Sequence, residues 1–311
     1  MGTKQQDDFS EIHDVNTDWN GVRNVLHSQE IVDYRSDMTV RIWFNEQNEE
    51  FRPHWHTALE IITPVEGTYD VTVSDTTYHL ETGDILLVSS GETHSIAAPE
   101  SGKRFIFLMD TNHVSGFRGY SSIQSIMTPA MHITKGSHPY IYDNLYRILM
   151  QMRNEYFSSN SYRDIVIYSL LMNFLVEIGR NHLETATFFP SVRVNKQKEY
   201  LQKFNDVFEY IDAHYMDDLT LEAVASSVGF SKYHFTRLFK QYTNSTFYDY
   251  LSYKRLKVAE TLLEQPDLSI TEIAMQSGFS SISTFNRIFR QQKDCTPSEY
   301  RAMCAASTRR I

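Results

Sequence analysis

The sequence predicts a multi-domain protein, in which an all-β barrel is followed by an α-helical hairpin and then by an all-α domain with two helix-turn-helix motifs. Three patterns predict this order. Short apolar runs with period-two alternation fill residues 1–135, apolar residues at helical spacing follow over 136–183, and one helical pattern occurs twice within 200–305. Residues 184–199 contain Pro190 and have mixed polarity, so we expect a linker there.

The overall composition is that of a soluble globular protein. Of the 311 residues, 41% are hydrophobic and 22% are charged. The two cysteines, Cys295 and Cys304, lack the spacing of a metal site, and so few cysteines fit a reducing compartment. The N-terminus has no apolar core, and the longest apolar run, over 165–176, is shorter than the roughly 20 residues of a membrane span. We expect a cytoplasmic protein that does not enter a membrane.

Charge is distributed unevenly along the chain. The net charge is −10, which taken alone would argue against binding to nucleic acid. Residues 200–311, however, contain 13 basic and 13 acidic residues, whereas residues 1–199 contain 16 basic and 26 acidic residues. The acidic excess therefore lies entirely in the first part, and the two parts are expected to have different roles.

The first domain shows the pattern of many short strands. The segment 38–44 alternates Met38, Val40, Ile42 and Phe44 on one face, which predicts a half-buried strand. Further short runs, separated by turn residues, predict strands at 68–73, 76–80, 85–88 and 105–109. Closely spaced short strands favour a sandwich or a barrel.

Two amphipathic helices are predicted between residues 136 and 183. Their apolar positions recur three or four residues apart, at Ile141, Leu145, Ile148, Leu149, Met152 and Tyr156, and again at Tyr168, Leu171, Leu175 and Ile178. A helical hairpin of this kind could cap the barrel or form the seam of a dimer. An apolar stripe that stays exposed needs a partner, so we favour a homodimer with Leu171 and Leu175 at its seam.

The third domain contains an internal repeat. Identical residues recur 49 positions apart at Leu219/Leu268, Ala225/Ala274, Gly229/Gly278, Phe230/Phe279 and Ser231/Ser280. After a one-residue insertion the offset becomes 50, at Phe235/Phe285, Arg237/Arg287, Phe239/Phe289, Gln241/Gln291, Thr246/Thr296 and Tyr250/Tyr300. Two copies are too few for a solenoid and indicate a pair of equivalent modules.

Each copy of the repeat predicts a helix-turn-helix. Gly229 and Gly278 provide the left-handed conformation that ends a first helix, and Ser231 and Ser280 stand where the next helix needs an N-cap. The second helix of each module contains basic residues and no acids, which suits contact with DNA phosphates and base edges. Two ordinary helical hairpins with solvated basic faces are the alternative, and the matched repeat argues against it.

Residues 200–305 resemble the DNA-binding domain of the AraC/XylS family of transcription regulators. The motifs that carry this resemblance are LEAVASSVGFSKYHFTRLFK, which starts at Leu221, and ITEIAMQSGFSSISTFNRIFR, which starts at Ile270. In that family one long helix, here about 245–265, joins the two modules. The resemblance implies that the two recognition helices enter successive major grooves on one face of double-stranded DNA.

The resemblance also places individual residues against DNA. Arg is the best reader of guanine and Asn suits adenine, and the base-facing positions are Tyr233, Thr236, Arg237, Ile282, Ser283, Asn286 and Arg287. The phosphate-facing positions are Lys232, Lys240 and Arg290. Because Ile282 stands where a polar reader is expected, the readout by the second module is less well defined than that by the first.

Two motifs of the first domain resemble those of the cupins, a family of small double-stranded jelly-roll barrels. They are HWHTALEIITPVEG at 54–67 and GDILLVSSGETH at 83–94, where Ser89 replaces the usual proline. His54, His56 and Glu60 have the same parity on a strand, so they are expected on one face. His94 could complete a four-ligand site in the barrel mouth, where imidazole and carboxylate suit iron, manganese, nickel or zinc.

Three interpretations of this cluster are open: a metalloenzyme, a ligand pocket with or without a divalent metal, and hydrogen bonding within the barrel. Cupin-like domains of AraC-type regulators typically sense small molecules, often sugars, without catalysis. The resemblance therefore implies a non-enzymatic regulator, expected to be an activator that works with RNA polymerase, needs no obligate cofactor and binds its effector through Trp43, His54, His56, Glu60 and His94. The alternative is a metal-dependent cupin enzyme, an isomerase or dioxygenase, fused to a DNA-binding domain.

Overall fold

The computed structural model describes residues 24–308, apart from 27, 36, 47–49, 98–100, 186–193, 244, 264, 266 and 294. The chain divides into two compact units. The barrel unit runs to Gly116 and continues from Met127 to Asn181, and the helical unit combines Phe117–Ile126 with the chain from His182 onward. This division differs from the domain boundaries expected at 135 and 183 because residues 117–126 group with the helices.

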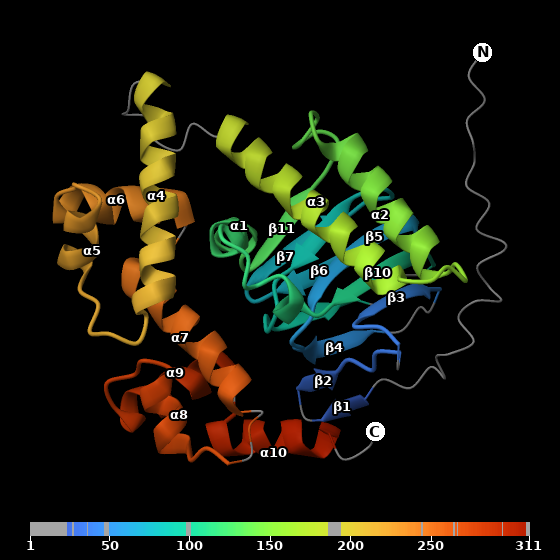
Figure 1. The fold of residues 1–311 in the computed structure, drawn as a ribbon. Coiled ribbons are helices and arrows are strands. Elements are labelled where there is room, and N and C mark those ends of the chain that lie inside the picture. Colours follow the sequence, from blue (N-terminus) through green and yellow to red (C-terminus); the bar gives the residue numbers. More distant parts are fainter. Residues whose placement is uncertain are drawn as a thin grey trace. The chain divides into compact units, whose positions relative to one another are not determined.

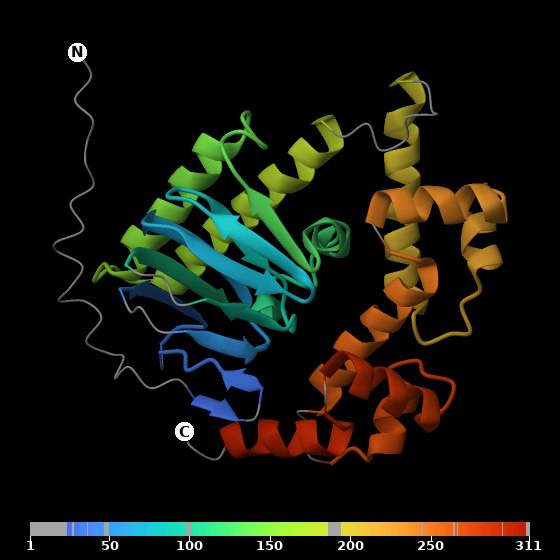
Figure 2. The same cartoon turned by 180° about the vertical axis from the view of Figure 1, so that it is seen from behind.

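The core of the barrel unit lies between two antiparallel sheets (Figures 1 and 2). One sheet has the strand order β11-β8-β5-β10-β3, the other has the order β4-β9-β6-β7, and β1 pairs with β2 in a short ribbon. The strands are β1 Asn24–Leu26, β2 Gln29–Ile31, β3 Val40–Asn45, β4 Phe51–His54, β5 Leu59–Glu66, β6 Tyr69–Val73, β7 Thr76–Leu80, β8 Ile85–Val88, β9 His94–Ile96, β10 Lys103–Met109 and β11 Ala130–Ile133. The closely spaced short strands therefore form the barrel-like first domain that they predicted.

Strand β3 is buried on both faces, so the prediction of a half-buried strand is wrong. Val40, Ile42 and Phe44 are buried as expected, but Trp43 is only 6% exposed as well. Trp43 belongs to the core between the sheets and stacks on Phe51. Two helices, α2 (Tyr142–Tyr156) and α3 (Arg163–Thr185), cover the other face of the five-stranded sheet (Figure 1), so both faces of β3 are buried.

Helices α2 and α3 form the predicted hairpin, but its apolar stripe is buried within the barrel unit. Leu171 is 0% exposed and Leu175 is 1% exposed. Asp164 holds α3 on the sheet by accepting a hydrogen bond from the Thr39 N–H at 3.1 Å. The expectation that Leu171 and Leu175 stay exposed at a dimer seam is wrong, because the sheet of the same chain already covers them.

The helical unit contains the two predicted helix-turn-helix modules. Helices α5 and α6 form the first module, α8 and α9 form the second, and α7 runs between them (Figures 1 and 2). In the core of the first module, Phe204 and Phe208 of α4 pack with Phe235 and Phe239 of α6. The helices from α4 onward are α4 Val194–His214, α5 Leu221–Ser227, α6 Lys232–Thr243, α7 Phe247–Leu263, α8 Ile270–Gln276, α9 Ile282–Lys293 and α10 Pro297–Thr308.

Helix α7 is tied to both modules by buried or half-buried charges. Its Arg255 donates to the carbonyls of Tyr215 and Asp217, just after α4, at 2.8 Å each. Further along, buried Glu260 pairs with Lys293 of α9 at 2.9 Å. Burial by itself raises the pKa of Glu260, but Lys257 and Lys293 hold that pKa below its ordinary value. The connection between the modules is therefore a packed helix rather than a loose linker.

The segments between the predicted elements differ from expectation in two places. Helix α3 continues to Thr185 and α4 begins at Val194, so residues 194–199 of the expected linker are helical, while 186–193 lie outside the described residues. Between β10 and β11 the chain forms a 3-10 turn, η3 (Thr111–His113), and then helix α1 (Tyr120–Met127). Helix α1 was not predicted, because three serines interrupt its apolar positions.

Candidate functional site

The turn of each module is fixed by a glycine with positive φ. Gly229 has φ of 72° and Gly278 has φ of 88°. Directly after each glycine, the N–H of Phe230 or Phe279 donates to a carbonyl of the preceding helix at 2.9 Å, which closes the helix end. The glycines therefore have the role that the repeat predicted.

The helix after each turn begins at a serine cap. In the first module Ser231 accepts a hydrogen bond from the His234 N–H, as predicted. In the second module Ser281 caps α9 by accepting from the Thr284 N–H at 3.2 Å. The expected cap at Ser280 is wrong, because the extra residue of the second repeat lies in the turn and moves the helix start by one position.

Helices α6 and α9 expose matching stripes of polar and basic side chains. The stripes follow the helical spacing i, i+3, i+4 and i+7, and they are Tyr233, Thr236, Arg237 and Lys240 on α6, and Ser283, Asn286, Arg287 and Arg290 on α9. All of these side chains are exposed. Neither helix has an acidic residue within its bounds. Each module thus presents a cationic surface on a helix of the size that a major groove admits.

Three residues near these stripes are either paired with an acid or partly to fully buried. Lys232 forms an ion pair with Glu222 of α5, so its charge is already matched. Ile282 is half-buried at the start of α9. Lys293 is 3% exposed and points toward Glu260, so it adds nothing to the basic surface of α9. Among the predicted DNA contacts, Lys232 and Ile282 therefore have less structural support than the two stripes.

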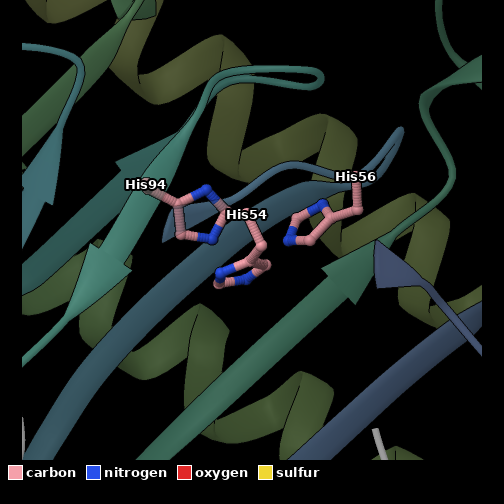
Figure 3. Close-up of side chains that lie close together, drawn as sticks. All are labelled: His54, His56 and His94. Carbon is pink, nitrogen blue, oxygen red and sulfur yellow. The ribbon is translucent and has the colours of Figure 1, made fainter. Parts of the chain in front are cut away.

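The histidine cluster lies between the two sheets of the barrel unit. His54 at the end of β4 is the register partner of His94 in β9, and Glu60 reaches them from β5 in the facing sheet. His56 lies in the connection between β4 and β5. The three histidine rings point toward one another (Figure 3), and their ligand nitrogens all lie within 4.8 Å of one another. These residues converge because the chain crosses between sheets after His56, and not because they share one strand face as expected.

The contacts of the cluster are close and shielded from solvent. Glu60 Oε2 lies 2.7 Å from His94 Nε2 and 3.1 Å from His56 Nε2. The four residues are each at most 3% exposed. Burial by itself raises the pKa of Glu60, but His94 and His56 hold that pKa well below its usual range. Burial likewise lowers the pKa of His94, but Glu60 raises it above its ordinary value.

The backbone sets the orientation of all three rings. Each Nδ1 lies within hydrogen-bond distance of a carbonyl oxygen two residues away: His54 with Arg52 O at 2.8 Å, His56 with Ala58 O at 3.2 Å and His94 with Glu92 O at 2.9 Å. A carbonyl only accepts, so each Nδ1 carries the proton. Each Nε2 then faces a carboxylate oxygen, and either a proton or a metal cation can lie between the two atoms.

One expected effector residue lies apart from the cluster, and one residue of the cluster was missed. Trp43 packs in the apolar core with Phe51 and is not brought to the histidines. Glu30 of β2 lies 3.2 Å from His54 Nε2 through its Oε2. The contact depends on the pairing of β2 with the chain around Trp55. No local spacing signals such a contact, so sequence reasoning could not find Glu30.

Ser89, the departure from the cupin motif, has a structural role. Its N–H donates to Pro129 O at 3.0 Å, and its hydroxyl lies 3.3 Å from that of Thr128. A proline at position 89 would have neither the N–H nor the hydroxyl. The replacement therefore gives this chain a bond to the segment that enters β11.

The donor set of the cluster fits a divalent transition metal. Three imidazoles whose Nδ1 protons are held by the backbone, together with one carboxylate, match the ligands that zinc, iron and manganese take in proteins. His54, His56, His94 and Glu60 would hold such an ion, which would supply a fixed double positive charge among these side chains. The three carbonyls that accept from the Nδ1 groups would then orient the ligands.

Two family models match the chain, one over most of the barrel unit together with residues 117–126 and one within the helical unit. A model described as an AraC-like ligand binding domain matches residues 39–175, and a model described as a helix-turn-helix domain matches residues 224–303. Among the helices of the described residues, none combines the length and the apolar character needed to cross a membrane.

Three relatives are similar to parts of the chain. The regulatory protein PocR of Salmonella typhimurium is 44% identical over 99 residues, which are 32% of this chain and only 33% of PocR. The regulatory protein SoxS of Escherichia coli K12 is 40% identical over 96 residues, which are 31% of this chain and 90% of SoxS. The lactose operon transcription activator of Staphylococcus xylosus is 28% identical over 243 residues, which are 78% of this chain and 82% of the activator. All three are named as regulators and not as enzymes, and the similarity to SoxS spans nearly its whole length. The chain belongs to the AraC/XylS family of transcription regulators and is a DNA-binding regulator with an AraC-like ligand-binding domain.

Proposed function

We propose that the barrel unit binds a small effector and that this binding controls how the two modules engage DNA. The observation that carries the DNA part is the pair of matching stripes on α6 and α9, which are exposed and free of acids. The effector part is supported by the match to an AraC-like ligand binding domain and by the buried polar cluster inside the barrel. Burying so many polar groups costs stability, and a binding role accounts for their retention.

We further propose that the chain activates transcription together with RNA polymerase in response to a sugar. This part is supported by the similarity over 78% of the chain to a relative named as a lactose operon transcription activator. The sugar would not bind at the histidine cluster itself. His56 and His94 contact Glu60 directly, and a sugar ring would have to separate these side chains.

A second effector class is favoured by the geometry of the cluster. Small divalent cations need no cavity beyond the space between the Nε2 atoms, and the Nδ1 contacts already orient those atoms. We propose that a transition metal ion binds His54, His56, His94 and Glu60. The ion would act in sensing and needs no catalytic step.

Metal binding is tested on the full chain after dialysis against a chelator. Addition of Zn²⁺ or Mn²⁺ should give one bound ion per chain by elemental analysis and raise the unfolding temperature reported by tryptophan fluorescence. His56→Gln should abolish both effects, while His79→Gln, a change of an exposed histidine whose side chain is 79% exposed, should keep them. If no ion is bound stoichiometrically, the cluster is a hydrogen-bonded network and the metal proposal is wrong.

Sugar binding is tested in parallel with a panel of mono- and disaccharides that includes lactose. An effector sugar should raise the same unfolding temperature and change the affinity of the chain for a DNA duplex selected from a random pool. A panel in which neither sugars nor metals change DNA affinity would contradict control by both of these ligand classes.

We also propose that the chain works as a homodimer on paired sites. Because Leu171 and Leu175 are buried, the dimer contact would use the outer face of α3, where Ile165 is 69% exposed and Val166 is 39% exposed. Exposed apolar side chains that adjoin on one helix are typical of an interaction surface.

A further inference from the structure

The segment Phe117–Ile126 interrupts the barrel sequence but packs within the helical unit. It leaves the five-stranded sheet after β10 and returns to it at β11. Both of its ends are therefore covalently attached to strands of the barrel. We call residues 117–126 the control segment.

The control segment docks on one face of α4. Three of its side chains each bond to one polar side chain of α4: Arg118 to both carboxylate oxygens of Glu209 at 2.5 and 2.7 Å, Ser121 to Asp212 at 2.5 Å, and Ser122 to Asn205 at 2.7 Å. The three α4 residues are spaced i, i+4 and i+7, so they form a single polar row along that helix. Each residue of this row has one hydrogen-bonding partner in the control segment.

The contact involves the helices that set the geometry of both modules. The core of the first module, which contains Phe204 and Phe208 of α4, also receives Ile126 of the control segment. Asp212, the partner of Ser121, forms an ion pair with Lys254 of α7 at 2.8 Å. Lys254 also donates to the Ser121 hydroxyl at 3.5 Å, so the control segment touches both the helix that supports α6 and the helix that joins the two modules.

At its other end the control segment leads back to the histidine cluster. The chain after α1 is held by Ser89, whose N–H donates to Pro129 O at 3.0 Å. Two residues further on, the Gly91 N–H donates to His56 O at 2.7 Å. A shift of the loop that carries His56 would thus be passed through residues 89–91 to the point where the control segment ends.

We propose that the control segment is the element through which the barrel unit sets the DNA affinity of the helical unit. The inference rests on the proposed effector control. Besides the packing of Ile126, the contact consists of serine hydrogen bonds and an ion pair in which the Arg118 side chain is 81% exposed, so the control segment can separate while the rest of the helical unit keeps its core. When docked, the control segment restrains α4 and α7 and hence the spacing of α6 and α9. When released, it allows that spacing to vary.

A disulfide lock tests this proposal without any effector. Ser122→Cys and Asn205→Cys are combined in a chain whose native cysteines are removed by Cys295→Ser and Cys304→Ser. The dissociation constant for a duplex selected from a random pool by the wild-type chain should differ at least about fivefold between the oxidised and reduced protein, a ratio of the size seen in allosteric coupling. The single variant Ser122→Cys in the same background should show no such difference. If the pair forms the disulfide and the dissociation constant stays the same, docking does not control DNA binding.

A charge reversal provides the opposite perturbation. Arg118→Glu should release the control segment and shift the dissociation constant in the direction opposite to the lock, and Arg118→Glu with Glu209→Arg should restore it. Arg147→Glu, the same charge change at an exposed position of α2, measures the electrostatic effect alone. Arg118→Glu behaving like Arg147→Glu would overturn the proposal. If an effector changes the dissociation constant for DNA but the disulfide does not, only the role of the control segment is contradicted. If the disulfide changes that dissociation constant but no effector does, only the proposed effector control is contradicted.

Discussion

Arg237 and Arg287 occupy equivalent places in the two modules, and both are exposed in the middle of their stripes. Their neighbours show that a basic residue on these helices does not by itself form part of a DNA surface. Lys232 is paired with Glu222, and Lys293 is buried against Glu260. At the scale of single residues, DNA binding is therefore expected to depend on the basic side chains that stay exposed on the outer faces of α6 and α9.

The first prediction concerns this pair of arginines. Arg237→Ala and Arg287→Ala should each weaken binding to a selected duplex by about 1–3 kcal/mol and relax base preference at one position, because each removes a bidentate donor from a groove. Arg147→Ala removes the same charge from exposed α2 and should change affinity much less. Fluorescence anisotropy measures both quantities. If both variants bind like wild type, α6 and α9 are not the recognition helices.

The second prediction concerns the buried charge that joins the modules. Glu260→Gln should lower the free energy of unfolding of the helical unit by about 3 kcal/mol at neutral pH, because it removes the carboxylate that faces the buried Lys293. The pair of exposed Glu199 and half-buried Lys203 serves as a control, since Glu199→Gln should cost less than about 1 kcal/mol. All three tryptophans lie before residue 56, so urea unfolding of the helical unit is followed by far-UV circular dichroism.

The same pair gives a defined pH dependence. The pKa of Glu260 is lowered in the folded chain from its ordinary value of 4.5. Its stabilising effect is therefore fully present above about pH 4.5 and is lost as the pH falls through the lowered folded value. The difference between wild type and Glu260→Gln should shrink in that acidic range, and a difference that stays constant would show that Glu260 is not ionised at neutral pH.

The residues of the candidate effector site were predictable only in part. His54, His56, Glu60 and His94 were found from motif spacing, and the structure brings them together although they come from different sheets. Glu30 was not found, because its contact with His54 follows from the pairing of distant segments. Trp43 was expected to bind the effector but packs in the core with Phe51, because sequence alone does not separate a tryptophan that fills the core from one that lines a site.

At the scale of elements, the repeat predicted both helix-turn-helix modules, because a glycine turn followed by a capped amphipathic helix is a local signal. Local signals of this kind did not predict the tertiary partner of helix α3. Its helical spacing correctly predicted a helix with an apolar stripe, but the covering partner of that stripe is the sheet of the same chain. Helix α1 was missed because it is short and polar and is stabilised mainly by contacts with distant α4.

The third prediction separates the two faces of α3. Leu171→Asp should lower the free energy of unfolding of the barrel unit by more than about 3 kcal/mol, because it places a charge where Leu171 is 0% exposed. Ile165→Asp, at a position 69% exposed, should change that free energy by less than about 0.5 kcal/mol. Tryptophan fluorescence in urea reports on the barrel unit.

The same two variants address the proposed dimer. In sedimentation velocity, wild type should be dimeric and Ile165→Asp should be monomeric while remaining folded. A folded Ile165→Asp variant that stays dimeric would place the contact elsewhere than on the outer face of α3.

At the scale of the whole molecule, one chain combines a ligand-binding part and a DNA-binding part that differ in net charge and in secondary structure. Charge and the internal repeat predicted two parts with different roles, and the resemblance to AraC-type and cupin motifs implied what those roles are. These features did not predict that residues 117–126 would pack with the helical unit, because that grouping depends on side-chain contacts between segments about 85 residues apart. Contacts between such distant segments produce no periodic pattern in the sequence.

The fourth prediction concerns the DNA that one chain can occupy. Helix α7 is anchored by Arg255 and Glu260, so α6 and α9 should contact successive major grooves about 10 bp apart. Inserting 5 bp between the two contacted sites should reduce affinity by about tenfold or more, because the second site then lies on the opposite face of the duplex. Inserting 10 bp should be no better tolerated, because the packed helix does not lengthen. Full recovery with the 10-bp insertion would show that the modules are joined flexibly.

The placement of residues 117–126 has a consequence for protein engineering. Chimaeras can be built by exchanging ligand-binding and DNA-binding domains between related regulators. In this sequence the obvious junction lies near residue 186, between α3 and α4. A chimaera cut there would carry the serines and Arg118 of one parent against an α4 from the other. Transplanting Asn205, Glu209 and Asp212 together with the sensor should keep such hybrids responsive, since the compatible unit of exchange is discontinuous in sequence.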